Sequence, residues 1–232
     1  MPLVVYALVF SGITALGVLV ILLQKIRSGG GSPLFALASF AAGFAATFPA
    51  WFIERAVLPY TKWYTGPAGD ALRAFCIAGL VEEGLKTGVL ILLSTSRFFR
   101  RVSDGPALAL AVGLGFGFSE NIFFSLQNPL TLVLRNFTSV PLHVLALIVP
   151  GWCLGMSRFA YKPLIVPGFL IAVLLHGSYD FFLLLGGAYS ILSFVLLGLS
   201  FFLAVLLFRS ARKLDEKEGR LYRQQENHIS AI

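Results

Sequence analysis

Apolar runs long enough to cross a lipid bilayer occupy most of this chain. A helix needs about 20 apolar residues to cross the hydrocarbon core of a membrane, and seven runs of about that length follow one another. Hydrophobic residues make up 57% of the 232 residues, and charged residues only 12%. The sequence therefore predicts an all-α polytopic helical bundle embedded in a membrane.

The predicted spans are separated by short polar connections. They cover residues 2–24, 33–53, 71–96, 106–127, 139–157, 164–186 and 188–208. The turn between the last two is so short that they are expected to form a tight helical hairpin, and counts of six to eight spans stay open. Residues 1–208 are predicted to form one integral membrane domain, and residues 209–232 a charged cytoplasmic tail.

Basic residues between the runs predict the orientation, because cytoplasmic loops collect lysine and arginine. The first, third and fifth connections and the tail hold most of the 18 basic residues, whereas the opposite side holds Arg55, Lys62, Arg73 and Arg135. This pattern predicts a multi-pass cell-membrane protein with its N-terminus outside and its C-terminus in the cytoplasm. The net charge of +7 is assigned to topology and to the lipid bilayer, and no nucleic-acid partner is expected.

Charged and imidazole side chains inside the runs are few and confined to four of them. A charged group at the centre of a membrane helix costs about 2.5–3.5 kcal/mol on insertion scales and usually faces a bundle interior or a wet cavity. The first, second and seventh runs are expected to carry none. The intramembrane polar residues are Glu82, Glu83, Lys86, Glu120, Asn121, His143, His176 and Asp180. They predict one shared polar site.

Helical geometry sharpens this expectation. Residues four apart lie on one face of a helix, so Glu82 shares a face with Lys86, and His176 with Asp180. Adjacent residues are about 100° apart, so one of Glu82 and Glu83 is expected to act directly and the other to orient a neighbour. The alternative interpretation, that these residues form ion pairs that only hold helices together, is weaker because small and hydroxyl residues do that at lower cost.

Two kinds of chemistry fit such a site. A glutamate could activate water as a general base, with histidine and asparagine donors stabilising the oxyanion. Alternatively, a divalent metal such as zinc could be held by carboxylates and imidazoles, although no HExxH motif is present. The candidate ligands are Glu82, Glu120, His143, His176 and Asp180. A proton- or cation-coupled transporter is the competing class, but the inverted repeats that it would favour are not visible.

The run GLGFGF at residues 113–118 contains a GxxxG pair, Gly113 and Gly117. No strand precedes it, so it is not a dinucleotide-binding motif. We expect these glycines to allow close helix packing beside Glu120.

The polar motifs together resemble the PrsW intramembrane proteases, which are related to the CAAX prenyl endopeptidases and Abi proteins. The matching pieces are EEGLK at 82–86, GFGFSEN at 115–121, His143 and HGSYD at 176–180, in family order on successive helices. The CAAX enzymes would show histidine in place of Glu120 and arginine one position after Lys86, which favours the PrsW branch.

The resemblance implies a membrane-embedded endopeptidase that cleaves a single-span membrane protein, in bacteria often an anti-sigma factor. It places the paired glutamates on Glu82 and Glu83, and its later motifs on Phe116, Glu120, Asn121, His176 and Asp180. The expected catalytic residues are Glu82, Glu83, Glu120 and His176, supported by Lys86, Asn121, His143 and Asp180. Counting helix rise from each span's entry point puts the site at or outside the membrane midplane, which predicts a cut near the extracytoplasmic side.

Overall fold

The computed structural model describes the chain except for residues 1, 29–31, 126–128, 161 and 230–232, and within that part the chain is helical, without a strand. The longer helices are α1 (Pro2–Ser28), α2 (Pro33–Val57), α4 (Leu80–Ser94), α5 (Asp104–Ser125), α7 (Ser139–Phe159), α8 (Ile165–Leu185) and α9 (Ser190–Ile229). The shorter ones are η1 (Leu58–Thr61), α3 (Gly66–Ala71), η2 (Leu72–Gly79), α6 (Pro129–Phe137) and η3 (Gly187–Tyr189).

Five helical stretches in the described residues are long and apolar enough to cross a membrane. They are Pro33–Thr61, Asp104–Phe124, Thr131–Phe159, Ile165–Leu185 and Gly187–Gly219, and Gly12–Gln24 is a shorter apolar helix. These stretches confirm the predicted all-α polytopic bundle. The third predicted span, residues 71–96, is not among them. Its charged residues Glu82, Glu83 and Lys86 interrupt the apolar run.

That third span is built from three consecutive helical segments. The short helix α3 leads into η2, a π-helical segment, which continues directly into α4. The wider turn of a π-helix shifts the side chains that follow it around the axis, and such segments are frequent at functional sites. Here it ends at Gly79, three residues before Glu82.

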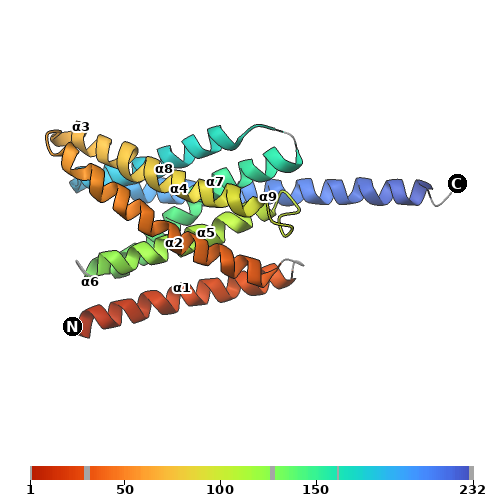
Figure 1. Cartoon of the computed structure of the whole chain (residues 1–232), viewed down its shortest axis with the longest axis horizontal. Coiled ribbons are helices and arrows are strands. Elements are labelled where there is room, and N and C mark those ends of the chain that lie inside the picture. The colour runs from red at the N-terminus through yellow and green to blue at the C-terminus, as the bar shows by residue number, and fades with distance from the viewer. Residues whose placement is uncertain (1, 29–31, 126–128, 161, 230–232) are drawn as a thin grey trace.

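The helices α5 and α7 form the centre of the bundle. About 61% of the most apolar stretch of each is buried, against 17% for α9. Figure 1 shows α2 crossing over α5 and α1 lying along the lower side of the bundle, while α9 packs against α7 and α8. The many apolar side chains exposed on α1 and α9 face outward, as expected of surfaces that contact lipid.

Glycines set the distance between α5 and α7. A Cβ at Gly113 would meet the backbone of His143 and Val144, and one at Gly117 would lie 3.0 Å from Cδ2 of His143 and 3.1 Å from Cα of Val140. The predicted GxxxG packing is therefore confirmed. The pair lets the helix that carries Glu120 approach the helix that carries His143.

The hairpin between α8 and α9 turns at Gly186 and Gly187, whose φ angles are +67° and +55°. Glycine adopts such positive φ angles without steric cost. The helix α9 then continues through position 208, where the domain and the tail were predicted to meet. Beyond it, Ala211 is buried, and the Asp215 carboxylate accepts hydrogen bonds from the backbone N–H groups of Val102 and Ser103.

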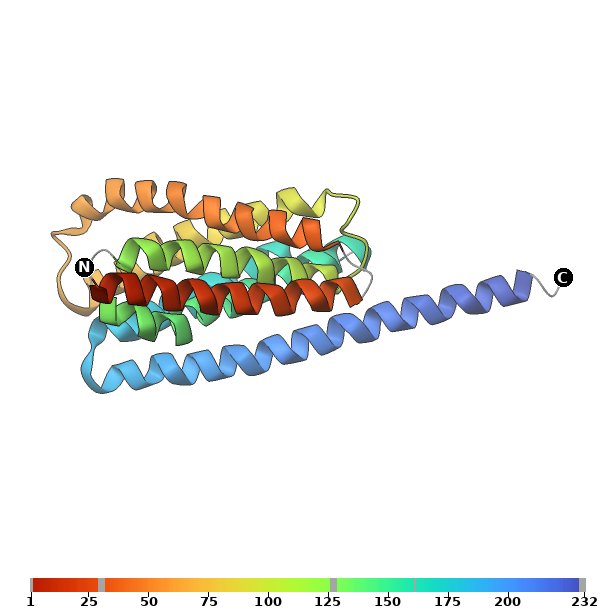
Figure 2. The same ribbon diagram turned by 90° about the horizontal axis from the view of Figure 1, so that it is seen from below.

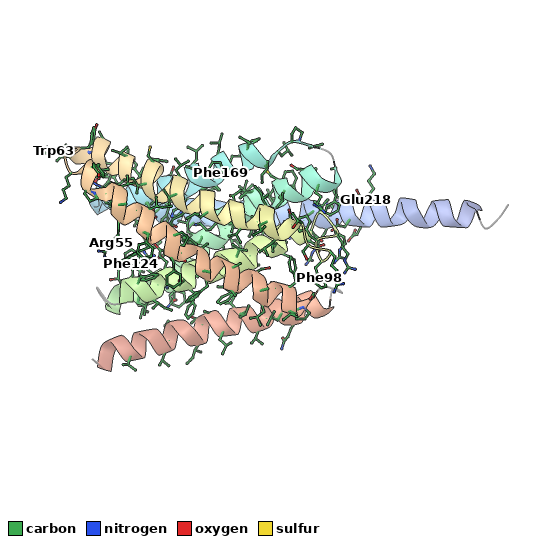
Figure 3. The ribbon with its side chains drawn as sticks, viewed as in Figure 1. Arg55, Trp63, Phe98, Phe124, Phe169 and Glu218 are labelled. Atoms are coloured by element: carbon green, nitrogen blue, oxygen red, sulfur yellow. The ribbon has the colours of Figure 1, made fainter. Side chains whose placement is uncertain are left out.

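The two ends of the bundle differ in what they present. The N-terminus of α1, Trp63 and α6 lie at one end, whereas Phe98 and the protruding part of α9 lie at the other (Figures 1 and 3). Figure 2 shows α9 running along the bundle and extending well beyond it. Glu82, Glu83 and Lys86 lie on α4, which is connected to the first end through η2 and α3.

Candidate active site

One turn of α4 places two carboxylates and an ammonium group inside the bundle. The side chains of Glu83 and Lys86 are fully buried, and Glu82 is 5% exposed. The Lys86 Nζ lies 2.6 Å from Glu83 Oε1 and 3.4 Å from Glu82 Oε2, and 4.4 Å from the centre of the Phe116 ring. Lys86 therefore balances part of the charge of both glutamates, as the i,i+3 and i,i+4 spacings predicted.

The helix α8 brings His176 against this turn. Its Nδ1 lies 2.8 Å from Glu83 Oε1, while its Nε2 lies 3.3 Å from Asp180 Oδ2 and 3.8 Å from Glu82 Oε2. Glu83 and Asp180 thus each contact one ring nitrogen of His176. Nε2 is the nitrogen that faces Glu82.

The helix α7 contributes His143, which lies four residues after the start of the helix. The structure places it at the centre, 1% exposed. Its Nε2 lies 2.6 Å from Glu120 Oε2 and 3.3 Å from the Ser139 hydroxyl. Its Nδ1 lies 3.0 Å from Lys86 Nζ and 3.6 Å from Glu82 Oε2.

Sequence reasoning missed Arg135, which was counted as a loop residue that reports orientation. It lies on the short helix α6, where its guanidinium donates from Nη2 to Glu120 Oε2 at 2.6 Å and from Nε to Asn121 Oδ1 at 3.0 Å. The same group stacks 3.8 Å from the Phe124 ring centre. The sequence did offer a signal for Arg135. Lys86 is paired by its helical spacing with Glu82 and Glu83, so Glu120 needed a cation from elsewhere in the chain.

Sequence reasoning also missed Glu54, since the second span was predicted to end at residue 53 and to carry no charge. The expectation of an uncharged second span is wrong, because α2 continues to Val57 and includes Glu54. Glu54 follows Thr47 and Ala50 on the face that packs against Phe116. It lies within electrostatic range of Glu82 and Glu120, and its Oε1 is buried without a hydrogen-bond partner among the described residues.

The predicted site residues form one connected network. Contacts run from Asp180 through His176, Glu83 and Lys86 to Glu82 and His143, and from His143 through Glu120 and Arg135 to Asn121. Asn121 is at one end of this series of contacts and is fully buried. Its amide nitrogen donates to Asn136 Oδ1 at 3.0 Å, so it is directed toward α6. Its expected role as an oxyanion donor stays a prediction.

Three of these residues fit a metal ion. Glu82, His143 and His176 each offer one ligand atom, all within 4.8 Å of one another, and all three are buried. Two imidazoles and one carboxylate are a typical protein ligand set for catalytic zinc. Each histidine also has a carboxylate on its other ring nitrogen, Glu120 for His143 and Glu83 for His176. Such outer carboxylates commonly orient metal-binding histidines.

Comparison with known proteins gives a consistent result. A family model described as "PrsW family intramembrane metalloprotease" matches residues 31–208. Similar proteins named "Protease PrsW" occur in Geobacillus kaustophilus (33% identity over 155 residues, 65% of this chain and 67% of the relative) and in Bacillus subtilis (31% over 153 residues, 63% and 68%). Another in Clostridioides difficile is 32% identical over 123 residues, covering 48% and 52%. No solved structure matches.

The matched stretches span between about half and about two thirds of these relatives' lengths. The family match covers α2 to the first half of α9, and therefore includes every helix that supplies the network.

Proposed function

Because the chain belongs to the PrsW family of intramembrane metalloproteases, we propose that it hydrolyses a peptide bond of a single-span membrane protein at the cluster of Glu82, His143 and His176. The observation that carries the proposal is the convergence of these three side chains from α4, α7 and α8. In a site that excludes most water, a carboxylate beside two oriented imidazoles is suited to activating water and to protonating a leaving amine. Family membership favours peptide hydrolysis over the alternative function of a proton- or cation-coupled transporter.

The surrounding residues have distinct tasks in this proposal. Glu82 contacts the reacting atoms, either by accepting a proton from the attacking water or by binding a metal. Glu83 positions His176, with which it shares a 2.8 Å contact. Glu120 positions His143 at 2.6 Å and is itself held by Arg135 at 2.6 Å. Lys86 keeps the paired glutamates together by reducing their mutual repulsion.

We propose that Glu82, His143 and His176 hold a divalent metal such as zinc. A bound zinc ion would supply Lewis-acid activation of water and of the scissile carbonyl. One contact favours the second candidate, a metal-free glutamate hydrolase: Lys86 Nζ lies 3.0 Å from Nδ1 of His143, the nitrogen that a metal would take. The same nitrogen can serve the lysine or the metal, but not both.

Elemental analysis separates these two candidates. Purified protein is expected to contain about one divalent metal per chain, to lose it to a chelator and to melt at a lower temperature afterwards. A His143→Gln variant should retain much less metal than the parent protein. Full hydrolytic activity in protein shown to be free of metal would leave the glutamate mechanism alone.

The proposed substrate is a single-span protein, of the anti-sigma factor type that the family resemblance implies, cut near its extracytoplasmic end. The test is to incubate purified protein in proteoliposomes with a panel of single-span membrane proteins. Glu82→Gln keeps the shape of the side chain but removes its basic oxygen, and should lower cleavage by about 100-fold or more. Glu218→Gln, an exposed position on the protruding part of α9 (Figure 3), is the matched control. Near-normal cleavage by Glu82→Gln would refute the assignment.

A further inference from the structure

Glu54, three residues before the end of α2, is an acid to which the proposed mechanism gives no task. Its Oε1 atom is buried and has no hydrogen-bond partner among the described residues, although the residue as a whole is partly exposed. The neighbouring Arg55 does not balance it, because that guanidinium lies 4.6 Å from the Trp51 ring centre. A buried carboxyl oxygen without a partner costs free energy, so stability alone does not explain this acid.

Packing of α2 on α5 places this acid one turn beyond Glu120. The Thr47 hydroxyl donates to the Phe116 carbonyl oxygen at 3.3 Å, and further along both helices the Trp51 ring stacks on Phe123, with ring centres 5.8 Å apart. The two helices therefore run in the same direction. The acid lies seven residues after Thr47, whereas Glu120 lies four residues after Phe116. The offset of three residues is about 4.5 Å of helix, and because helical side chains tilt toward the N-terminus, the carboxyl group reaches back toward Glu120.

The charged neighbours of Glu54 are residues of the active site. Its carboxyl group interacts electrostatically most strongly with Glu82, then with Glu120, and more weakly with His176 and Lys86. It does not belong to the three-residue set whose ligand atoms lie within 4.8 Å of one another. Glu54 therefore lies beside the reacting centre without being one of the candidate metal ligands.

The other acids of the site each contact a cation or an imidazole within the described part of the chain. These pairs are Glu82 and Glu83 with Lys86, Asp180 with His176, and Glu120 with Arg135 and His143. Glu54 is left without a counter-charge. Its free oxygen is therefore available to a hydrogen-bond donor or a cation that arrives with the substrate.

Hydrolysis of a peptide bond itself produces such a cation. The oxygen of the attacking water bonds to the acyl carbon, the bond from that carbon to nitrogen breaks, and the acyl product leaves as a carboxylate. The nitrogen keeps its own hydrogen, receives both protons of the water and becomes the ammonium group of a new N-terminus. A carboxylate is the usual partner of an ammonium group in proteins.

We infer that Glu54 is a further substrate-contacting residue, which binds the nitrogen of the bond being cut and pairs with the ammonium group that forms on it. This inference rests on the proposed function and assigns a group to the departing side of the reaction. Glu82 acts on the water, and Glu54 accepts a hydrogen bond from the departing nitrogen. The ligand class that Glu54 recognises is a peptide with a free amino terminus.

Binding of a cleavage product tests this role without turnover. The probe is a synthetic peptide with the sequence of the C-terminal product of a single-span protein that the parent enzyme cleaves, compared with its N-acetylated form at about pH 6.5, where an α-amino group is charged. The parent protein should bind the free amine more tightly by about fivefold or more. Glu54→Gln, which keeps the shape of the side chain, should abolish this difference. Glu218→Gln, at an exposed position, is the control and should keep it.

Stability and kinetics separate this role from a structural one. Glu54→Gln removes an uncompensated acid, so the melting temperature should not fall. The kcat for the single-span substrate should fall by about tenfold or more, and Glu54→Asp, which keeps the charge, should recover part of it. A lowered melting temperature together with an unchanged preference for the free amine would assign Glu54 a structural role and overturn the inference.

The outcomes also separate this inference from the proposed function. If no single-span protein is cleaved in a manner that Glu82→Gln abolishes, the proposed function fails and the inference fails with it. If such cleavage is found and Glu54→Gln cuts at the parent rate and still prefers the free amine, the inference fails while the function stands. Equal binding of the free and acetylated peptides to the parent protein would likewise overturn the inference alone.

Discussion

At the scale of single residues, the site is a balance of buried charges. Lys86 is fully buried and contacts Glu82, Glu83 and His143, while Arg135 holds the more exposed Glu120. Buried ion pairs contribute little net stability, but removing one partner leaves an uncompensated charge and is strongly destabilising. Each cation is therefore expected to hold the acids in their arrangement, and its removal is expected to destabilise the bundle.

Replacing Lys86 by methionine tests the first of these cations. The substitution keeps the apolar stem but leaves Glu82 and Glu83 without their shared counter-charge. Breaking a buried pair costs about 3–5 kcal/mol, so the variant should unfold at a clearly lower temperature in detergent and lose peptidase activity. Lys62→Met, at an exposed position, is the control and should change neither quantity. Unchanged thermal stability of Lys86→Met would contradict the account of Lys86 as the counter-ion.

Replacing Arg135 by methionine tests the second of the two cations in the site. Without the guanidinium, Glu120 is free to reorient, and His143 loses its fixed position. We expect the rate of substrate cleavage to fall at least tenfold, with partial recovery in Arg135→Lys, which restores the charge but not the contact to Asn121. Arg55→Met is the matched control, since Arg55 lies 4.6 Å from the Trp51 ring centre at the same end of the bundle. Equal rates for both methionine variants would remove Arg135 from the positioning network.

At the scale of helices, close packing of α5 and α7 decides where the histidine of α7 meets the carboxylate of α5. Gly117 faces both Val140 and His143. The same helix pair is in contact further along, where a Cβ at Gly151 would lie 2.7 Å from the Gly105 carbonyl oxygen and from the Ala109 Cβ. Side chains larger than hydrogen at these points would separate the helices.

Gly117→Leu is therefore expected to abolish activity and lower the melting temperature, because the leucine would displace either His143 or the backbone of α7. Gly117→Ala should be milder, since its Cβ needs the neighbours to move by only a few tenths of an ångström. Gly17→Leu on α1, where a Cβ meets no described residue within 4 Å, is the control. Normal activity in Gly117→Leu would show that the glycine is not needed for the α5–α7 distance.

The helix α9 allows a test of where the membrane domain ends. Ala211 packs in a cluster with Val102 and Met156, and Asp215 binds the backbone of residues 102 and 103. Truncation after Phe208 removes these contacts and should lower the melting temperature. Truncation after Gly219 keeps these contacts and should leave the melting temperature unchanged. Equal stability of the two truncated proteins would support the boundary predicted at residue 208.

At the scale of the whole molecule, the site lies toward one end of the bundle. Glu54 is three residues from the end of α2, Glu120 five from the end of α5, and His143 four from the start of α7. All three ends are on the side of α6 and Trp63 (Figure 3). Basic residues concentrate at the opposite end, around Phe98 and along the protruding part of α9. With the basic end in the cytoplasm, the site would open toward the outside.

The orientation leads to a prediction about the cut. Reporter fusions should place the N-terminus outside and the C-terminus in the cytoplasm. Mass spectrometry of the products should then locate the cleaved bond at or outside the outer half of the substrate's membrane span. A cut on the cytoplasmic side, or an N-terminus found in the cytoplasm, would reverse the assignment.

Much of this molecule follows from the sequence alone, because the bilayer and the helix impose simple rules. Apolar length predicts membrane helices, and the 3.6-residue repeat places Lys86 beside Glu82 and Glu83 before any coordinates are known. The cost of charges in hydrocarbon predicts that the acids and histidines share one site. The GxxxG pair predicts a close helix contact.

Only the tertiary structure decided which side chains meet across helices. The rotation and tilt of each helix depend on packing against several neighbours at once, and no periodicity within one helix contains that information. For this reason Arg135 was mistaken for a loop residue, and Glu54 fell outside its predicted span.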